Sequence, residues 1–211
     1  IEPVMKPLGL DWRASVALLT SIPANAFDGD VALKSINLPS TVTSIGSAAF
    51  RNTAVTAINF ASVATIGNDA FNGCSALTSV VLSNTIRTIG ARAFANCGSI
   101  ETLSLSIGLT DIGELAFENC VKVKEISLPA TLVNMAGNPF SNCTGITSFS
   151  VDASNKNFVY QNGALFDKNM FTLIYYSSAN TAESYTLPTT VHEILGGAFA
   201  GSKLKVFEIP A

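Results

Sequence analysis

The fold is decided by one stretch, Ile112-Gly-Glu-Leu-Ala-Phe-Glu-Asn-Cys-Val-Lys-Val-Lys-Glu-Ile-Ser-Leu-Pro129, which recurs along the chain with small changes. Its Ala-Phe pair returns at Phe27, Phe50, Phe71, Phe94, Phe117, Phe140 (as Pro-Phe) and Phe199. The successive steps are 23, 21, 23, 23, 23 and 59 residues. A fixed period of roughly 20 to 50 residues indicates a repeat architecture, in which each unit packs on its neighbours.

Each repeat predicts one tight turn and one short strand. Two residues after every phenylalanine the position is Gly or Asn, the residues that most readily accept a left-handed backbone, so we expect a short helical turn to stop there. Farther on, apolar residues alternate, as Ile126 and Leu128 do, which is typical of a strand. We therefore expect strands near 33–38, 55–60, 77–82, 100–105, 123–128, 146–151, 182–187 and 204–209.

A unit of this size cannot bury its apolar side alone, so successive units must stack with their strands parallel, as a solenoid. The repeat is interrupted between Phe140 and Phe199, where the step exceeds one repeat of 23 by 36 residues. Inside this interval, 157–176 shows short aromatic and β-branched runs divided by turn residues, and Asn162-Gly163 is a strong hairpin signal. An inserted β-hairpin is therefore expected.

We expect a single domain over 1–211. Its parts are an N-terminal cap or partial repeat at 1–17, regular repeats at 18–151, the hairpin insertion at 152–184 and a final, truncated repeat at 185–211. The strand at 204–209 has no further repeat to cover it, so we expect either a native chain that continues beyond Ala211 or weak self-association through this edge.

The recurring pattern Ile-Gly-x-x-Ala-Phe-x-Asn-Cys-x-x-Leu-x-x-Ile-x-Leu-Pro closely resembles the BspA-like class of leucine-rich repeats. The resemblance covers residues from about 18 to the C-terminus and recurs seven times. The expected fold is thus an α/β solenoid, a right-handed leucine-rich-repeat superhelix with a parallel β-sheet on its concave face and short helical turns on the other side. The resemblance also implies a secreted or surface-attached protein, since several members are adhesins toward host matrix proteins or other cells.

Composition excludes several other classes of protein. The chain is 48% hydrophobic and 13% charged, which is typical of a folded domain and not of a disordered one. With 12 basic and 15 acidic side chains, it has no electrostatic attraction for nucleic acid. No apolar run approaches the roughly 18 residues that a membrane span needs. The family resemblance implies a protein partner, such as a host matrix or cell-surface protein, and the chain is expected to be a monomer apart from the weak association named above.

Four cysteines recur with the repeat, at Cys74, Cys97, Cys120 and Cys143. Stacked repeats place them in a column whose side chains point in parallel, so we expect buried free thiols in preference to disulfides. Four sulfurs in a line also cannot surround a zinc ion tetrahedrally.

Catalytic chemistry is hard to assemble from this sequence. Its single histidine, His192, is expected to face solvent, and the carboxylates scatter over different edges of the solenoid. Asp28-Gly29-Asp30 lacks the remaining ligands of a calcium loop. No enzyme activity, cofactor or metal is predicted. Asn142-Cys-Thr144 meets the glycosylation sequon, and its use is left open.

The surface is what remains for function. Candidate protein-binding residues lie on the concave strands and on the hairpin: Asn37, Asn59, Thr78, Ser104, Ser127, Ser150, Tyr160, Tyr175 and Tyr176. The alternative interpretation is that the polar strand face is only solvated and that the tyrosines cover the apolar flank of the solenoid. We expect a non-enzymatic extracellular or cell-surface interaction or adhesion module; the alternative is a structural spacer that projects another module from the surface.

Overall fold

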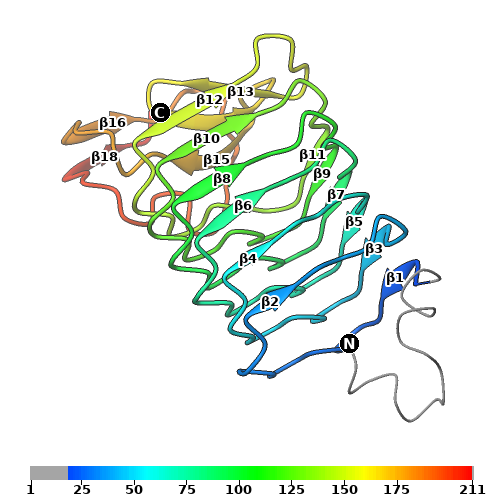
Figure 1. The fold of residues 1–211 in the computed structure, drawn as a ribbon. Coiled ribbons are helices and arrows are strands. Elements are labelled where there is room, and N and C mark those ends of the chain that lie inside the picture. The colour runs from blue at the N-terminus through cyan, green and yellow to red at the C-terminus, as the bar shows by residue number, and fades with distance from the viewer. Residues whose placement is uncertain (1–18, 211) are drawn as a thin grey trace, which may run out of the picture.

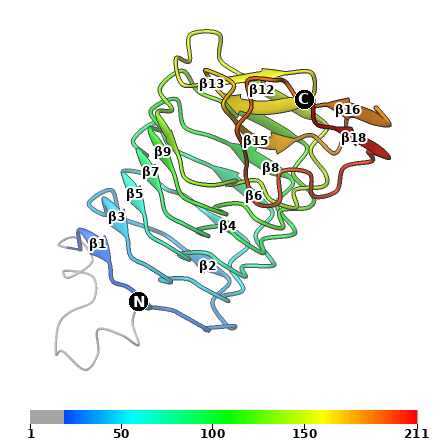
Figure 2. The same cartoon turned by 180° about the vertical axis from the view of Figure 1, so that it is seen from behind.

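A computed structural model describes residues 19–210 of the chain, so the cap expected at 1–17 lies outside the described residues. Over this range the protein is a β-solenoid, a stack of coils that rises from the N-terminal to the C-terminal end (Figure 1). Sixteen of its eighteen strands form eight coils, with one strand on a side wall and one on the front of each coil. Seen from behind, the front strands of successive coils lie one above another (Figure 2).

In the first six coils the side-wall strands form a single six-stranded parallel sheet that the sequence did not lead us to expect, and the wall strands of the last two coils belong to a different sheet. The members of the six-stranded sheet are β1 (Ser21–Ile22), β3 (Ser44–Ile45), β5 (Thr65–Ile66), β7 (Thr88–Ile89), β9 (Asp111–Ile112) and β11 (Asn134–Met135). In most of these strands the second residue is a buried isoleucine and the first faces outward, so the Ile-Gly step of the repeat is a strand. Strands of two residues carry no alternation that a sequence search could detect.

All eight strands expected from the alternating apolar residues exist, but they are shorter than expected and do not form one sheet. They pair as β2 (Ser35–Ile36) with β4 (Ala57–Ile58), β6 (Ser79–Val81) with β8 (Thr102–Ser104), β10 (Glu125–Leu128) with β12 (Ser148–Val151), and β16 (Ser184–Thr186) with β18 (Val206–Glu208). Each pair is parallel, as predicted. The front of the solenoid is therefore a row of separate two-stranded ribbons.

The prediction of short helical turns is wrong, because residues 19–210 contain no helix. The predicted right-handed superhelix of helix-backed repeats is likewise not supported. In the Ala-Phe turns alternate amides point along the stack and not back into their own turn. Phe27 N donates to Ala49 O at 2.8 Å and Gly29 N to Arg51 O at 2.8 Å. These bonds to the next coil take the donors that an α-helix would use internally.

The left-handed positions were nevertheless predicted correctly. Every Gly or Asn two residues after a repeat phenylalanine has a positive φ: Gly29, Asn52, Gly73, Asn96, Asn119, Asn142 and Gly201. A second left-handed position, two residues before the phenylalanine, was not expected, since it is filled by residues such as Arg92 (φ 52°) and Leu115 (φ 56°). These residues carry no preference for that backbone, so the bonding to neighbouring coils must hold them there.

The core is built from columns that run along the stack. Phe27, Phe50, Phe71, Phe94, Phe117 and Phe140 form a ladder of parallel rings with centroids 5.2 to 5.8 Å apart. A glycine follows four of the wall isoleucines, as Gly46, Gly67, Gly90 and Gly113, and allows close approach of the coils, because a Cβ on Gly113 would lie 2.3 Å from Ala91 N. One period of the sequence thus corresponds to one coil of the solenoid.

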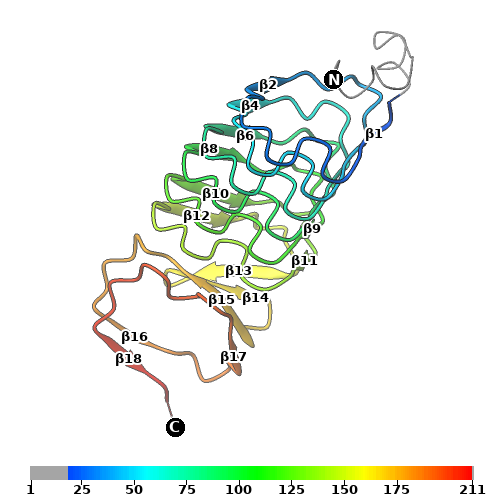
Figure 3. The same cartoon turned by 90° about the horizontal axis from the view of Figure 1, so that it is seen from below.

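The interruption of the repeat contains a hairpin and then a further coil. β13 (Phe158–Gln161) and β14 (Ala164–Asp167) are antiparallel and joined by Asn162 (φ 51°) and Gly163 (φ 81°). β15 (Thr172–Tyr176) is antiparallel to β14 but parallel to β17 (Glu193–Ile194), the wall strand of the last coil. The solenoid thus resumes at β15, and its last coils lie beyond the hairpin at the C-terminal end (Figure 3).

Candidate protein-binding groove

The front face opens between β8 and β10, which belong to different two-stranded sheets. The inward side chains of β8 are more exposed than those of the coil before it. Leu103 and Leu105 are partly exposed, whereas Val80 and Leu82, which hold the same positions in the preceding coil, are buried. The inward apolar side chains of this coil are therefore accessible to a partner, unlike those of the coil before it.

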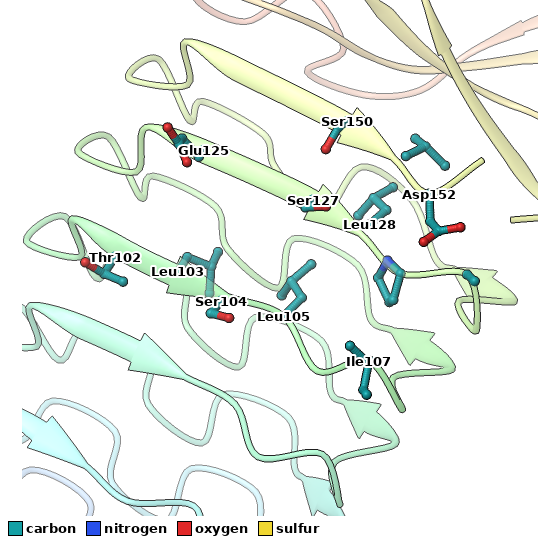
Figure 4. A pocket seen from close by; sticks show the side chains of 13 residues that line it. Thr102, Leu103, Ser104, Leu105, Ile107, Glu125, Ser127, Leu128, Ser150 and Asp152 are labelled. Carbon is teal, nitrogen blue, oxygen red and sulfur yellow. The ribbon is translucent and has the colours of Figure 1, made fainter. Parts of the chain in front are cut away.

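A groove of about 550 Å³ lies over this opening. Its lining comes from three neighbouring coils, on β8, β10, β12 and the segments that follow them (Figure 4): Thr102, Leu103, Ser104, Leu105, Ile107, Glu125, Ser127, Leu128, Pro129, Ala130, Ser150, Val151 and Asp152. Its volume falls within the roughly 300 to 1,000 Å³ of small-molecule pockets, but here the hollow is an open trough on a sheet face. Ile107, 69% exposed, stands at the apolar end.

The charges of the groove are all of one sign. Glu125 and Asp152 are exposed carboxylates, and the lining contains no lysine, arginine or histidine. Asp152 Oδ1 accepts a hydrogen bond from Ser154 N at 2.8 Å, which holds this carboxylate at the end of the groove. The remaining polar groups are the hydroxyls of the outward front residues, which can donate or accept.

A second hollow of about 320 Å³ continues the groove toward the hairpin. It shares Ser150, Val151 and Asp152 with the first and adds Phe149, Ala153, Phe158, Val159, Tyr160 and Lys168. Tyr160 stacks on Phe149, with ring centroids 5.0 Å apart, so the hairpin is fixed to β12 at this point. The hairpin thus forms one wall of a continuous surface.

The structure brings together only some of the candidate residues. Asn37, Asn59, Thr78, Ser104, Ser127 and Ser150 are all exposed, and of these Ser104, Ser127 and Ser150 line the groove. Asn37 and Asn59, on the first ribbon, and Thr78, on the next coil, lie outside it. Tyr160 lies in the second hollow.

Tyr175 and Tyr176 do not lie on the surface, with exposed fractions of 1% and 0%. Tyr175 packs edge-on against Phe140, with centroids 6.3 Å apart, and therefore continues the aromatic core past the last Ala-Phe turn before the interruption. Burial raises the pKa of Tyr175 to about 12. The two rings point to opposite faces of the strand, and each face is covered by its own hydrophobic cluster, so neither ring presents surface to a partner.

The other reactive groups lie away from the groove. The four cysteines are buried free thiols, and each donates to the carbonyl of a phenylalanine in the preceding coil, as Cys97 Sγ does to Phe71 O at 3.1 Å. His192 is exposed beside Phe171, as expected. Asp28 is ion-paired with Arg51, whose hydrogen bonds lower the pKa of that carboxyl. Within residues 19–210 no cluster of three or more metal-ligating side chains occurs.

The groove itself was missed by sequence reasoning, although one signal was available. After the front strand most coils carry a polar corner, such as Ser83-Asn84-Thr85, whereas the β8 coil carries Ser106-Ile107-Gly108. Thr85 Oγ1 donates to Val63 O in the coil before it, at 2.8 Å, and Gly108 has no side chain to do so. An apolar residue at a polar corner of the repeat indicates an exposed apolar site.

Stacked parallel coils with two strands each, closed by tight turns, define a solenoid repeat protein with a recessed front face. The sequence matches the model of the BspA type leucine-rich repeat region in six copies, over residues 20–147, 56–172 and 108–211. The chain therefore belongs to the BspA-type leucine-rich repeat family. No curated protein sequence matches it.

Solved structures of bacterial leucine-rich repeat proteins are similar to this chain. The pneumococcal vaccine antigen PcpA is 25% identical with a TM-score of 0.72, over 90% of this chain and 45% of that one. A leucine-rich cell surface protein of Faecalibacterium prausnitzii is 21% identical (TM-score 0.69; 90% of this chain, 64% of that one). A leucine-rich repeat protein of Eubacterium ventriosum is 21% identical (TM-score 0.54; 79% and 50%). The chain spans less than two thirds of each of these proteins.

No helix able to cross a bilayer is present in the described part of the chain. Repeat proteins of this family are scaffolds whose extended surfaces mediate protein interaction.

Proposed function

We propose that this chain is a non-enzymatic, extracellular or cell-surface module that binds a protein partner, such as a host matrix or cell-surface protein, through its front face. The observation that carries the proposal is the groove over β8, β10 and β12, where the β8 coil leaves Leu103 and Leu105 partly exposed although the coil before it buries the equivalent residues. Solenoids use such extended faces for binding.

Two further observations support this assignment. A similar protein, 25% identical over 90% of this chain, is named as a pneumococcal vaccine antigen, which supports a place outside the cell for this chain too. The groove holds two carboxylates but no nucleophile with an adjacent base, which favours recognition over catalysis.

Site-directed photo-crosslinking tests the proposal. A photoreactive residue is placed at Ser104 or Ser127 on the front face, and, as the matched control, at Thr65, which is exposed on the side wall. Each variant is incubated with extracellular-matrix and cell-surface extracts and irradiated. We expect covalent protein adducts of discrete mass from the front positions and none from Thr65. Equal labelling from all positions, or none from any, would overturn the binding function and favour a structural spacer.

A further inference from the structure

We propose that the groove recognises an extended peptide segment in which an aliphatic side chain lies next to a lysine or arginine. This inference rests on the proposed protein-binding function and adds the chemistry of the partner. It follows from the apolar base of the groove, from the sign of its charges and from its open shape.

The apolar base selects an aliphatic side chain. Leu103 and Leu105 are partly exposed at the boundary between β8 and β10, which belong to different sheets, and Ile107 extends the same patch to the rim (Figure 4). Covering such a patch gains about 25 cal/mol per Å² of apolar surface removed from water. Aromatic side chains line the second hollow but not this one, so the stacking partners that an incoming ring prefers are absent from this lining.

The carboxylates select a cation. Glu125 and Asp152 face the groove from two neighbouring coils, and its lining holds no positive side chain; Lys168 of the adjoining hollow donates to Asn155 O at 3.3 Å. A partner with acidic side chains would meet like charges here, whereas lysine or arginine would pair with them across a partly desolvated surface. The stem of either residue can also lie along the exposed leucines while its charge reaches a carboxylate.

The open shape selects an extended segment. The groove crosses three coils and is flanked by the hydroxyls of Ser104, Ser127 and Ser150, each one coil from the next. Hydroxyls both donate and accept, so they can satisfy the amides and carbonyls of a peptide that crosses the coils. A peptide in this orientation presents alternate side chains to the groove, the aliphatic one over the leucines and the basic ones beside the carboxylates.

Selection from a library of displayed random dodecapeptides on the whole immobilised chain tests the proposal. Enriched peptides should contain lysine or arginine within two residues of Leu, Ile or Val. Their dissociation constants are then measured by fluorescence anisotropy against three groove variants, Ile107→Ser, Asp152→Asn and Glu125→Gln. We expect binding weakened about five- to tenfold in each, and a loss of affinity with salt that the two charge variants reduce.

Two controls match the changed residues. Val31→Ser removes an apolar side chain that is 75% exposed far from the groove, and Glu114→Gln removes an exposed carboxylate from the turn after β9. Both should leave peptide binding unchanged. The groove residues are exposed enough that their variants should fold, and circular dichroism checks this.

The outcomes separate this inference from the function on which it rests. Enrichment of acidic or uncharged peptides, no enrichment above bare support, or binding that groove variants do not weaken would overturn the basic-aliphatic specificity. Protein adducts at Ser104 or Ser127 would still stand in that case. If the crosslinking also gives no front-face adducts, the binding function fails as well.

Discussion

The phenylalanine ladder should make stability depend on position within the stack. Phe94 is fully buried, with ring centroids 5.2 Å from Phe71 and 5.5 Å from Phe117. Phe27 is half-buried and has one such partner among the described residues, Phe50 at 5.2 Å. Replacing either ring with leucine retains most of the apolar burial but removes the stacking.

The expected loss follows from the number of stacked pairs. Each aromatic pair contributes about 0.5–1.5 kcal/mol beyond its buried area. Phe94 also makes an edge contact with Phe60, with centroids 6.2 Å apart, so it has three aromatic pairs. Phe94→Leu should therefore lower the free energy of unfolding by about 1.5–4.5 kcal/mol, and Phe27→Leu by about a third as much. For a domain of this size the larger loss corresponds to a fall in Tm of about 3–18 °C.

Urea unfolding followed by far-ultraviolet circular dichroism measures both losses. Phe171→Leu is the matched control, because Phe171 is 50% exposed and lies outside the ladder, so its replacement should change stability by less than about 0.5 kcal/mol. Equal losses for Phe94→Leu and Phe27→Leu, or a loss at Phe94 no larger than that of the control, would refute the idea that stacking between coils stabilises the solenoid.

Three further predictions address the backbone, a buried hydroxyl and the thiol column. Gly113→Ala should lower the free energy of unfolding in urea by about 1–3 kcal/mol, because its Cβ would meet Ala91 N at 2.3 Å. Gly196→Ala is the control and should be nearly neutral, because no described atom lies within 4 Å of its Cβ position. Similar losses for the two variants would contradict the prediction. Tyr176→Phe should leave Tm unchanged or raise it, since the buried Tyr176 hydroxyl has no hydrogen-bond partner, and a fall would reveal one. Burial raises the pKa of Cys143 to about 12, so as the pH rises the unfolded chain loses this proton before the folded chain does. The contribution of Cys143 to stability should therefore be fully present below pH about 8.5 and fall above it by up to about 1.4 kcal/mol per pH unit. Cys143→Ala should remove this part of the pH dependence from urea midpoints measured between pH 8 and 11.

The sequence by itself determined the features that depend on a single residue or on local alternation. The spacing of the phenylalanines determined the coil length and the stacking. The Gly or Asn after each phenylalanine determined a left-handed position, because few other residues adopt one cheaply. Asn162-Gly163 determined the hairpin turn for the same reason. The alternating apolar residues located every front strand.

Only the tertiary structure decided how the coils bond to one another. The Ala-Phe turns have left-handed residues on both sides of the phenylalanine and send alternate amides to the next coil, so they cannot be helical, yet their sequence resembles a helix end. The wall strands exist through pairing between coils 21 to 23 residues apart, as between Ser21 and Ser44 or Ser44 and Thr65. Neither feature is encoded in a local pattern.

The groove is also a product of neighbouring coils. Leu103 follows the same alternation as Val80, so the alternation alone does not distinguish a partly exposed residue from a buried one. The difference appears only in the folded stack, where the groove lies over Leu103 and Leu105 at the boundary between β8 and β10. Conversely Tyr175 and Tyr176, aromatic residues in an inserted segment, became core because β15 pairs with both the hairpin and the last wall strand. The solvent exposure of a side chain depends on how neighbouring segments pack against it, so the sequence of any one segment does not determine it.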